Sequence, residues 1–292
     1  MNKVYERLAL LLLFCVPASS LLAEEWRFSD VDRIVALSDI HGAHDAFVAT
    51  LQNAGVVDDK SRWNGGETHL VITGDLVDRG ADSRQVMDLV MRLEVEAVSA
   101  GGRVHLTLGN HEVMNLIGDL RYVADAEYAA FADDESTAER EQWYQRFRSS
   151  YPVDADDAAV RSAFDEIAPP GFFGHRRAFG LDGMYGKWLL EKPLMIVNND
   201  TAFVHGGMPP YVAEHGLAGV NTMLKAELLG YLTARSSLED AGILSPIDRF
   251  KKLPSILSPM IDAGQLDEAR LKAAQVVLAH KDSPLNKAAG PL

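Results

Sequence analysis

Apolar and polar positions follow two alternating patterns in the first half of the chain. Short apolar runs rich in β-branched residues predict strands at 33–37, 69–73 and 103–108. Between them, apolar side chains recur at helical spacing and predict helices over 43–54 and 84–100. Strands that alternate with helices favour an α/β fold, in which helices cover the faces of a central sheet.

The middle of the chain has a different pattern. Residues 117–170 are acidic, rich in Ala and Glu, and carry aromatic residues on what reads as helical hairpin material. We interpret this segment as a helical insertion over one rim of the sheet, not as an independent domain. Strands are expected again at 194–197 and 201–204, joined by a turn, and helices over 221–233 and 266–279.

Composition and charge exclude several classes of protein. The 292 residues are 47% apolar and 24% charged, with a formal net charge of −14. Because affinity for nucleic acid comes from clustered Lys and Arg, this charge argues against a nucleic-acid partner. The sequence contains no Gly-x-Ser-x-Gly elbow, no phosphate-cradling P-loop and no dinucleotide fingerprint, so serine hydrolases, kinase-like enzymes and dehydrogenases are not favoured.

The first residues are typical of a secretory signal peptide, predicted over 1–23. A short basic stretch precedes the apolar run 8–16, and mostly small residues precede Glu24. The apolar run is short for a membrane-spanning helix, although an uncleaved anchor is the alternative. Cys15 is the single cysteine, so the mature domain, 24–292, would have neither disulfides nor a thiol nucleophile. We expect an exported protein of the bacterial periplasm without a stable membrane anchor after cleavage.

Polar motifs follow each of the three predicted strands. These motifs are Ser-Asp-Ile-His-Gly at 38–42, Gly-Asp-Leu-Val-Asp-Arg-Gly at 74–80 and Gly-Asn-His-Glu at 109–112. The carboxyl ends of parallel strands meet at one edge of a sheet, so the motifs are expected to converge there. A mixture of carboxylate, imidazole and amide oxygen ligands suits a pair of divalent metals.

The residue types suggest how such a metal pair would be held. Asp39 and His41 lie two residues apart at a strand end, so both can turn into one cavity. Asp75 could bridge two cations with its two oxygens, Asn110 could offer an amide oxygen, and the later hairpin would bring the ring of His205. Two metals held in this way would clamp a phosphoryl group and activate a water for in-line attack.

Neighbouring residues could supply the rest of the chemistry. His111 directly follows a candidate ligand and could protonate the leaving group as general acid. Asp78 could accept the ring N–H of His111 and keep the ring charged, while Arg79 offers a planar fork for phosphate. Glu112 could be an ordinary acid in the first turn of a helix or could support the ligands. Each residue alone also has a plain structural explanation, such as helix capping, but all of these explanations would have to hold together.

Together with Phe-Val-His-Gly-Gly at 203–207, the motifs resemble the signatures of calcineurin-type metallophosphoesterases. Val-Asp-Arg within the second motif is typical of the phosphoprotein-phosphatase branch. The helical insertion and Gly-Lys-Trp-Leu at 186–189 resemble the bacterial Shewanella-like protein phosphatases. The resemblance covers the chain from about Ile34 onward. It implies a four-layer α-β-β-α sandwich and a centre of two divalent metals (manganese, iron or zinc).

The resemblance also implies an activity and residue roles. The activity is hydrolysis of phosphomonoesters, with phosphoserine, phosphothreonine or phosphotyrosine of a protein, or a small phosphoester, as substrate. The implied metal ligands are Asp39, His41, Asp75, Asn110 and His205. The acid pair is His111 with Asp78, and phosphate binding is assigned to Arg79 and Asn110.

Two departures from the family pattern leave alternatives open. Ser38 replaces a glycine, which should matter little. More seriously, the family's later Arg-Gly and final Gly-His do not occur before Leu292, and we expect His280 to be structural, not the missing ligand. We therefore expect a C-terminally incomplete sequence that holds the second metal weakly. The alternatives are a hydrolase of nucleotides or dinucleoside polyphosphates, and a non-catalytic phosphate- or phosphopeptide-binding remnant.

Overall fold

The structure, a computed structural model, describes residues 25–208, 210–280 and 283. The predicted signal peptide, 1–23, lies outside the described residues. Within the described part of the chain, no helix has both the length and the apolar character that crossing a membrane requires.

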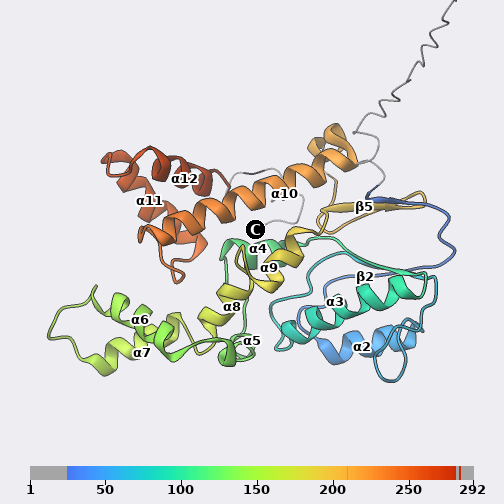
Figure 1. Cartoon of the computed structure of the whole chain (residues 1–292), viewed down its shortest axis with the longest axis horizontal. Helices are drawn as coiled ribbons and strands as arrows, with labels where there is room; N and C mark the ends of the chain where they lie inside the picture. The colour runs from blue at the N-terminus through green and yellow to red at the C-terminus, as the bar shows by residue number, and fades with distance from the viewer. Residues whose placement is uncertain (1–24, 209, 281–282, 284–292) are drawn as a thin grey trace, which may run out of the picture.

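One sheet contains three parallel strands in the order β2-β3-β4. They are β2 (Ile34–Leu37), β3 (His69–Ile72) and β4 (Arg103–Leu106), close to the predicted ranges. Helices α2 (His44–Asn53) and α3 (Ser83–Ser99) form the layer beneath this sheet in Figure 1. The apolar spacing read from the sequence becomes the buried face of α3, formed by Val86, Met87, Leu89, Val90, Leu93 and Ala97.

The second sheet has the order β1-β5-β6. Strand β1 (Arg27–Phe28) pairs in parallel with β5 (Met195–Asn198), which pairs antiparallel with β6 (Thr201–Val204). Helix α10 (Pro210–Asp240) lies over this sheet (Figure 1) and departs from helical dihedrals at Gly216, where φ is 65°. The helix predicted over 221–233 is therefore the middle of a longer one.

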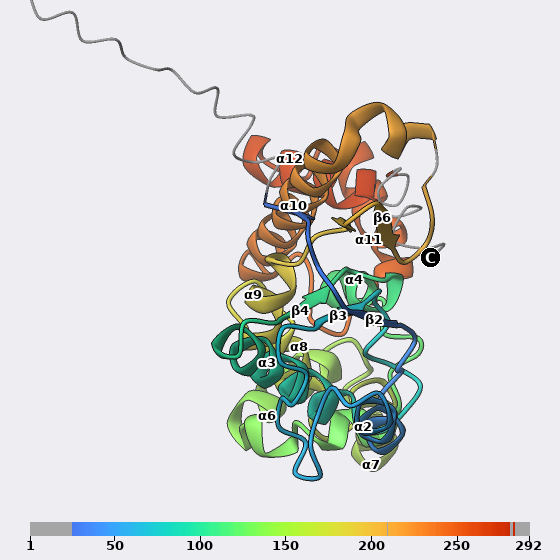
Figure 2. The ribbon, with the colours of Figure 1, turned by 90° about the vertical axis from the view of Figure 1, so that its right-hand side faces the viewer.

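Side chains from the two sheets meet between them. The ring of Phe28 lies 4.3 Å from that of His105 and 5.8 Å from that of His69, measured between centroids. The side-chain amide of Asn198 lies 3.0 Å from His69 Nδ1. Burial lowers the pKa of His105 to about 3. The ring is therefore uncharged at neutral pH and packs between the sheets. Figure 2 shows the resulting layers, α10 above the two facing sheets and α2 and α3 below, which confirms the predicted α/β fold.

A run of helices follows the third motif. It comprises α4 (Asn110–Ile117), α5 (Asp125–Ala129), the 3₁₀ turn η1 (Ala132–Asp134), α6 (Thr137–Arg148), α7 (Asp157–Ile167), α8 (Phe172–Ala178) and α9 (Met184–Leu190). A second apolar cluster, which includes Tyr144, Phe164 and Phe173, lies among α5, α6, α7 and α8. Helices α6 and α7 lie at the end of the molecule farthest from α2 in Figure 1.

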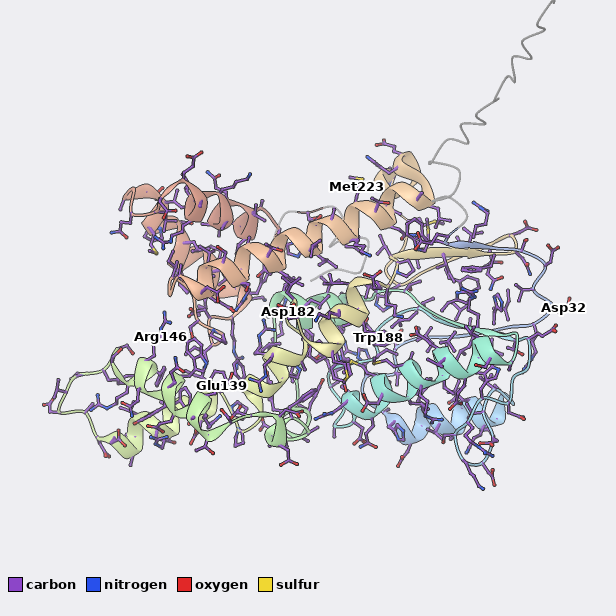
Figure 3. The ribbon with its side chains drawn as sticks, viewed as in Figure 1. Asp32, Glu139, Arg146, Asp182, Trp188 and Met223 are labelled. Carbon is purple, nitrogen blue, oxygen red and sulfur yellow. The ribbon has the colours of Figure 1, made fainter. Side chains whose placement is uncertain are left out.

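Polar contacts attach these helices to their neighbours. Trp188 of α9 donates its ring N–H to Glu94 Oε2 of α3 at 2.8 Å. Arg177 Nη1 of α8 donates to Glu139 Oε1 of α6 at 2.7 Å. Figure 3 labels Trp188 and Glu139 at these two junctions.

The last described helices are η2 (Phe250–Lys252), α11 (Leu253–Asp262) and α12 (Glu268–Ala279). Helix α12 packs against α10, and α11 packs against α12 and η2. The ring of His280, next to α12, lies 4.8 Å from that of Tyr231, and its Nδ1 is 2.7 Å from Glu227 Oε1. The sequence did not predict α11, which contains Pro254 and Pro259. In the structure Pro254 stands in the first helical turn, where no backbone donor is needed.

Candidate metal centre and active site

The loops after β2 and β3 hold an unusual backbone. Five residues there have left-handed dihedrals, namely Asp39 (φ 55°), His41 (47°), Asp75 (57°), Asp78 (71°) and Arg79 (67°). This conformation costs roughly 1–2 kcal/mol for an ordinary L-residue, and such residues gather at functional sites. Long-range hydrogen bonds hold the two loops together: His41 N–H donates to Asp75 O at 2.9 Å, and Gly80 N–H to His41 O at 3.0 Å. A Cβ on Gly80 would lie 2.3 Å from that same carbonyl oxygen, so only glycine fits there.

The side chains predicted to bind metal converge on Asp75. Its Oδ2 lies 3.6 Å from His41 Nε2 and 3.3 Å from His205 Nε2. Asp39 Oδ1 lies 3.7 Å from His41 Nε2, and Asn110 Oδ1 lies 3.2 Å from His205 Nε2. The structure thus brings all five together around Asp75. The ligand atoms of Asp39, Asp75 and His205 all lie within 4.8 Å of one another, and so do those of His41, Asp75 and His111.

The orientation of the two imidazoles fits a cation. His41 Nδ1 lies 3.1 Å from Val77 O, and His205 Nδ1 lies 2.6 Å from Thr73 O. A carbonyl oxygen only accepts, so each Nδ1 carries a proton, and each Nε2, which faces the carboxylates, is the atom that would bind a metal. His41 Nε2 is buried without a hydrogen-bond partner among the described residues. A buried imidazole lone pair aimed at carboxylate oxygens is a suitable donor set for a divalent metal.

The charges of this cluster depend on one another. Burial alone would lower the pKa of His205, but the Asp75 carboxylate and the Thr73 carbonyl raise this pKa to about 9. Conversely, burial would raise the pKa of Asp75, and the contact with His205 lowers it. A proton on His205 thus neutralises Asp75 where a cation would otherwise do so. Metal affinity should therefore fall as the pH is lowered.

A buried histidine–carboxylate pair lies beside the cluster. His111 Nδ1 is 2.6 Å from Asp78 Oδ2, and both side chains are at most 1% exposed. Asn115 Nδ2 donates to Asp78 Oδ1 at 2.8 Å and fixes the carboxylate. Arg79 Nη2 is 3.3 Å from His111 Nε2, so the guanidinium and this ring nitrogen face the same space. These are the positions that a phosphate and its leaving group would need.

Glu112, whose role the sequence left open, joins the loop after β3 to the start of α4. It is fully buried, and its carboxylate accepts backbone N–H groups from Asp75 at 2.8 Å, Leu76 at 2.7 Å and Gly109 at 2.9 Å. Burial and the charge of Asp75 raise its pKa, against these three donors. The available signal was its place three residues after Gly109, the N-cap of α4, which is the capping-box position.

Two residues near the site were missed from the sequence. The ring of Tyr122 lies 5.2 Å from that of His111 and 5.8 Å from the Arg79 guanidinium. Glu127, on α5, is fully buried; burial and the nearby Asp78 carboxylate raise its pKa to about 8. Nothing distinguishes Glu127 in an acidic segment that reads as solvent-exposed helix.

The facing sheets and the carboxylate–imidazole cluster at the strand ends define a metallophosphoesterase. Residues 32–231 match the family model described as calcineurin-like phosphoesterase, and the chain belongs to this family. The family resemblance inferred from the motifs is therefore confirmed.

Individual relatives agree with this assignment. The chain is 30% identical to Shewanella-like protein phosphatase 2 of Arabidopsis thaliana, over 75% of this chain and 57% of the relative. It is 24% identical to Shewanella-like protein phosphatase 1 of Plasmodium berghei, over 67% and 44%. Among solved structures it is similar to a cold-active protein-tyrosine phosphatase of a psychrophilic Shewanella (TM-score 0.51, 29% identity, 70% of this chain and 51% of that chain). The chain thus spans about half the length of the curated relatives it matches.

Proposed function

We propose that the chain is a metal-dependent phosphatase that hydrolyses phosphomonoesters. One observation carries the proposal: the candidate ligands meet at Asp75, directly beside a buried His111–Asp78 pair. Membership of the calcineurin-like phosphoesterase family and the names of the relatives support it.

The residues present would divide the metal-binding work. Asp39 and His41 would hold one metal, Asn110 and His205 the other, and Asp75 would contact both. Divalent metals bound there supply Lewis acidity and an attacking water that is reactive at neutral pH. A bidentate contact from a neighbouring guanidinium would orient the phosphate for in-line attack.

The His111–Asp78 pair would deliver a proton to the leaving oxygen. As the phosphorus–oxygen bond breaks, the leaving oxygen takes the proton from His111 Nε2 and departs as an alcohol or phenol. Asp78 keeps Nδ1 protonated and stabilises the charged ring before the transfer, as the 2.6 Å contact allows. The ring is then neutral and recovers its proton from water.

We further propose phosphorylated side chains of proteins as the substrates. The two curated relatives are named protein phosphatases, and the similar solved structure is titled a protein-tyrosine phosphatase. Dinucleoside polyphosphates are the competing substrate class.

A substrate panel tests both proposals. The full chain is stripped with a chelator, reloaded separately with manganese, iron or zinc, and assayed on p-nitrophenyl phosphate, phosphotyrosine and phosphoserine peptides, and diadenosine tetraphosphate. We expect metal-dependent turnover of the monoesters, with the peptides preferred. Preference for the tetraphosphate would contradict the protein-phosphatase proposal. Phosphate binding without turnover on any metal would contradict catalysis altogether.

We also propose that the protein is exported to the periplasm after cleavage following Ala23. The support is the basic, apolar and small-residue order of positions 1–23. Mass spectrometry of the protein from fractionated cells should find a periplasmic chain that begins at Glu24. An intact N-terminus in the cytosolic or membrane fraction would contradict export.

A further inference from the structure

A groove of about 460 Å³ lies where η2, α11 and α12 meet the segment that follows α4. Its lining is apolar except for two cations, and we call it the basic groove. The lining residues are Arg121, Phe250, Lys251, Leu253, Pro254, Val277 and Leu278. The volume is in the range of roughly 300–1,000 Å³ that is typical of ligand sites.

The floor of the basic groove is part of the main core. Leu253 and Val277 are each 1% exposed and Phe250 is 9% exposed. Phe250 N–H donates to Gly118 O at 3.2 Å, at the C-terminal end of α4. Arg235 binds Ile117 O at 3.0 Å and Asp248 O at 2.9 Å, which fixes the same junction. The groove is therefore a formed surface, tied to the helix that carries His111.

A row of side chains connects the groove to the candidate active site. Arg121 lines the groove, and its guanidinium lies 5.5 Å from the centroid of the Tyr122 ring. That ring is in turn 5.2 Å from the ring of His111. Tyr122 is 44% exposed, so a ligand can reach its surface. Because His111 faces the leaving group, the groove lies on the side where the remainder of a substrate would extend.

The charge of the groove is opposite to that of the molecule. The chain has 42 acidic and 28 basic residues. Exposed Lys251 belongs to the run Arg-Phe-Lys-Lys at 249–252 and is the charge of the lining that has no ion-pair partner among the described residues. Arg121 adds a second cation, which Asp119 balances in part through contacts at 3.0 Å to Nε and 2.5 Å to Nη2. A local basic surface in an acidic protein attracts acidic ligands and orients them.

We propose that the basic groove binds the polypeptide that flanks the phosphorylated residue of a protein substrate. An acidic flanking side chain would meet Lys251 and Arg121, and an apolar one would pack on Pro254 and Leu278, the apolar lining residues that are not buried. Tyr122 would lie under the chain between the groove and the phosphate. The inference rests on the proposed phosphatase function and adds a flanking-sequence preference to it.

Reversing one groove charge tests the proposal. Two phosphotyrosine peptides, with Asp-Leu or Lys-Leu flanks, are compared with p-nitrophenyl phosphate, which is too small to reach the groove. We expect Lys251→Glu to lower kcat/KM for the Asp-Leu peptide by about five- to tenfold, with p-nitrophenyl phosphate unchanged. Lys252→Glu is the matched control, since Lys252 is also exposed but does not line the groove.

A binding measurement separates this inference from the phosphatase proposal. Fluorescence anisotropy of the same peptides on His111→Asn protein, with and without Lys251→Glu, requires no turnover. The wild-type groove should favour the Asp-Leu peptide, and Lys251→Glu should remove the preference. Equal affinity for both peptides, or equal effects of Lys251→Glu and Lys252→Glu, would overturn the proposal that the groove binds the flanking polypeptide. Faster turnover of p-nitrophenyl phosphate by Lys251→Glu would also overturn it, because a segment of the chain itself would then occupy the groove. Absence of turnover by the wild type on any metal would refute only the proposed phosphatase activity and would leave the peptide-binding proposal to the anisotropy measurement.

Discussion

The loops of the candidate metal centre and the helical segment 125–167 are stabilised in opposite ways. The loops place five candidate site residues in left-handed backbone and rely on hydrogen bonds between segments, including two from the loop after β3 to Glu112. None of residues 125–167, all of which the structure describes, has a positive φ. That segment is held by an apolar cluster that includes fully buried Tyr144 and Phe164.

This difference separates function from stability. Left-handed backbone is unfavourable for most residues, so the site persists because the surrounding core over-determines it. The helical cluster stores no such strain and contributes through burial alone. Substitutions at the site should therefore change chemistry more than stability, and substitutions in the cluster should do the reverse.

The largest effect is expected on catalytic turnover, from a substitution at the candidate active site. His111→Asn removes the proposed acid and should lower turnover of p-nitrophenyl phosphate by ~10²–10⁴-fold, with metal content unchanged. Steady-state kinetics and elemental analysis on the same sample measure both quantities. His44→Asn, at a partly exposed histidine outside the cluster, should leave both at wild-type values. Loss of metal together with activity would assign His111 to metal binding instead.

On the stability side, Phe164→Ala should lower the free energy of unfolding by about 3–5 kcal/mol. Its ring is fully buried and lies 5.5 Å from Tyr144 and 6.1 Å from Phe173. Urea denaturation measures the change, and Val153→Ala, at a side chain 97% exposed, is the control in the same segment. Equal values for the two variants would show that this cluster does not contribute to the cooperative fold.

Glu127 links the two regions and should make stability depend on pH. Its pKa is raised from 4.5 to about 8, so between these values the folded chain holds a proton that the unfolded chain releases. The free energy of unfolding should therefore fall as pH rises through this window, by at most about 1.4 kcal/mol per pH unit. Glu127→Gln should flatten the slope in urea denaturation at pH 5 and pH 8. An unchanged slope would contradict a protonated Glu127.

The smallest expected effect is a change in the free energy of unfolding that has opposite signs for two aspartate-to-glycine substitutions. In metal-free protein, Asp39→Gly should raise the free energy of unfolding by up to ~1 kcal/mol, because glycine relieves the left-handed strain. Asp165→Gly, on an exposed position of α7, should lower it by about 1 kcal/mol or more. Destabilisation of similar size by both substitutions would remove the claim of strain at the site.

The sequence predicted what local pattern and motif order determine. Alternation of strands and helices gave the α/β class, and the strand-end motifs gave the side chains that converge on Asp75. What it missed depends on tertiary contacts: burial of Glu127 arises from packing of α5 near Asp78, and the φ of Asp39 is imposed by the loop after β3. Helix α11 was not predicted: Pro254 is compatible with its first turn, whereas Pro259 stands inside the helix, where local rules disfavour it.

The central claim is that Asp75 lies between two metal positions that support hydrolysis. It is tested most directly by counting manganese ions per chain after loading and gel filtration, with turnover of p-nitrophenyl phosphate measured on the same samples. Asp82→Asn is the matched control, since Asp82 lies at the start of α3, outside the ligand cluster. The account predicts bound manganese and turnover in the wild type and in Asp82→Asn, and loss of both in Asp75→Asn. Wild-type metal content and turnover in Asp75→Asn would contradict it.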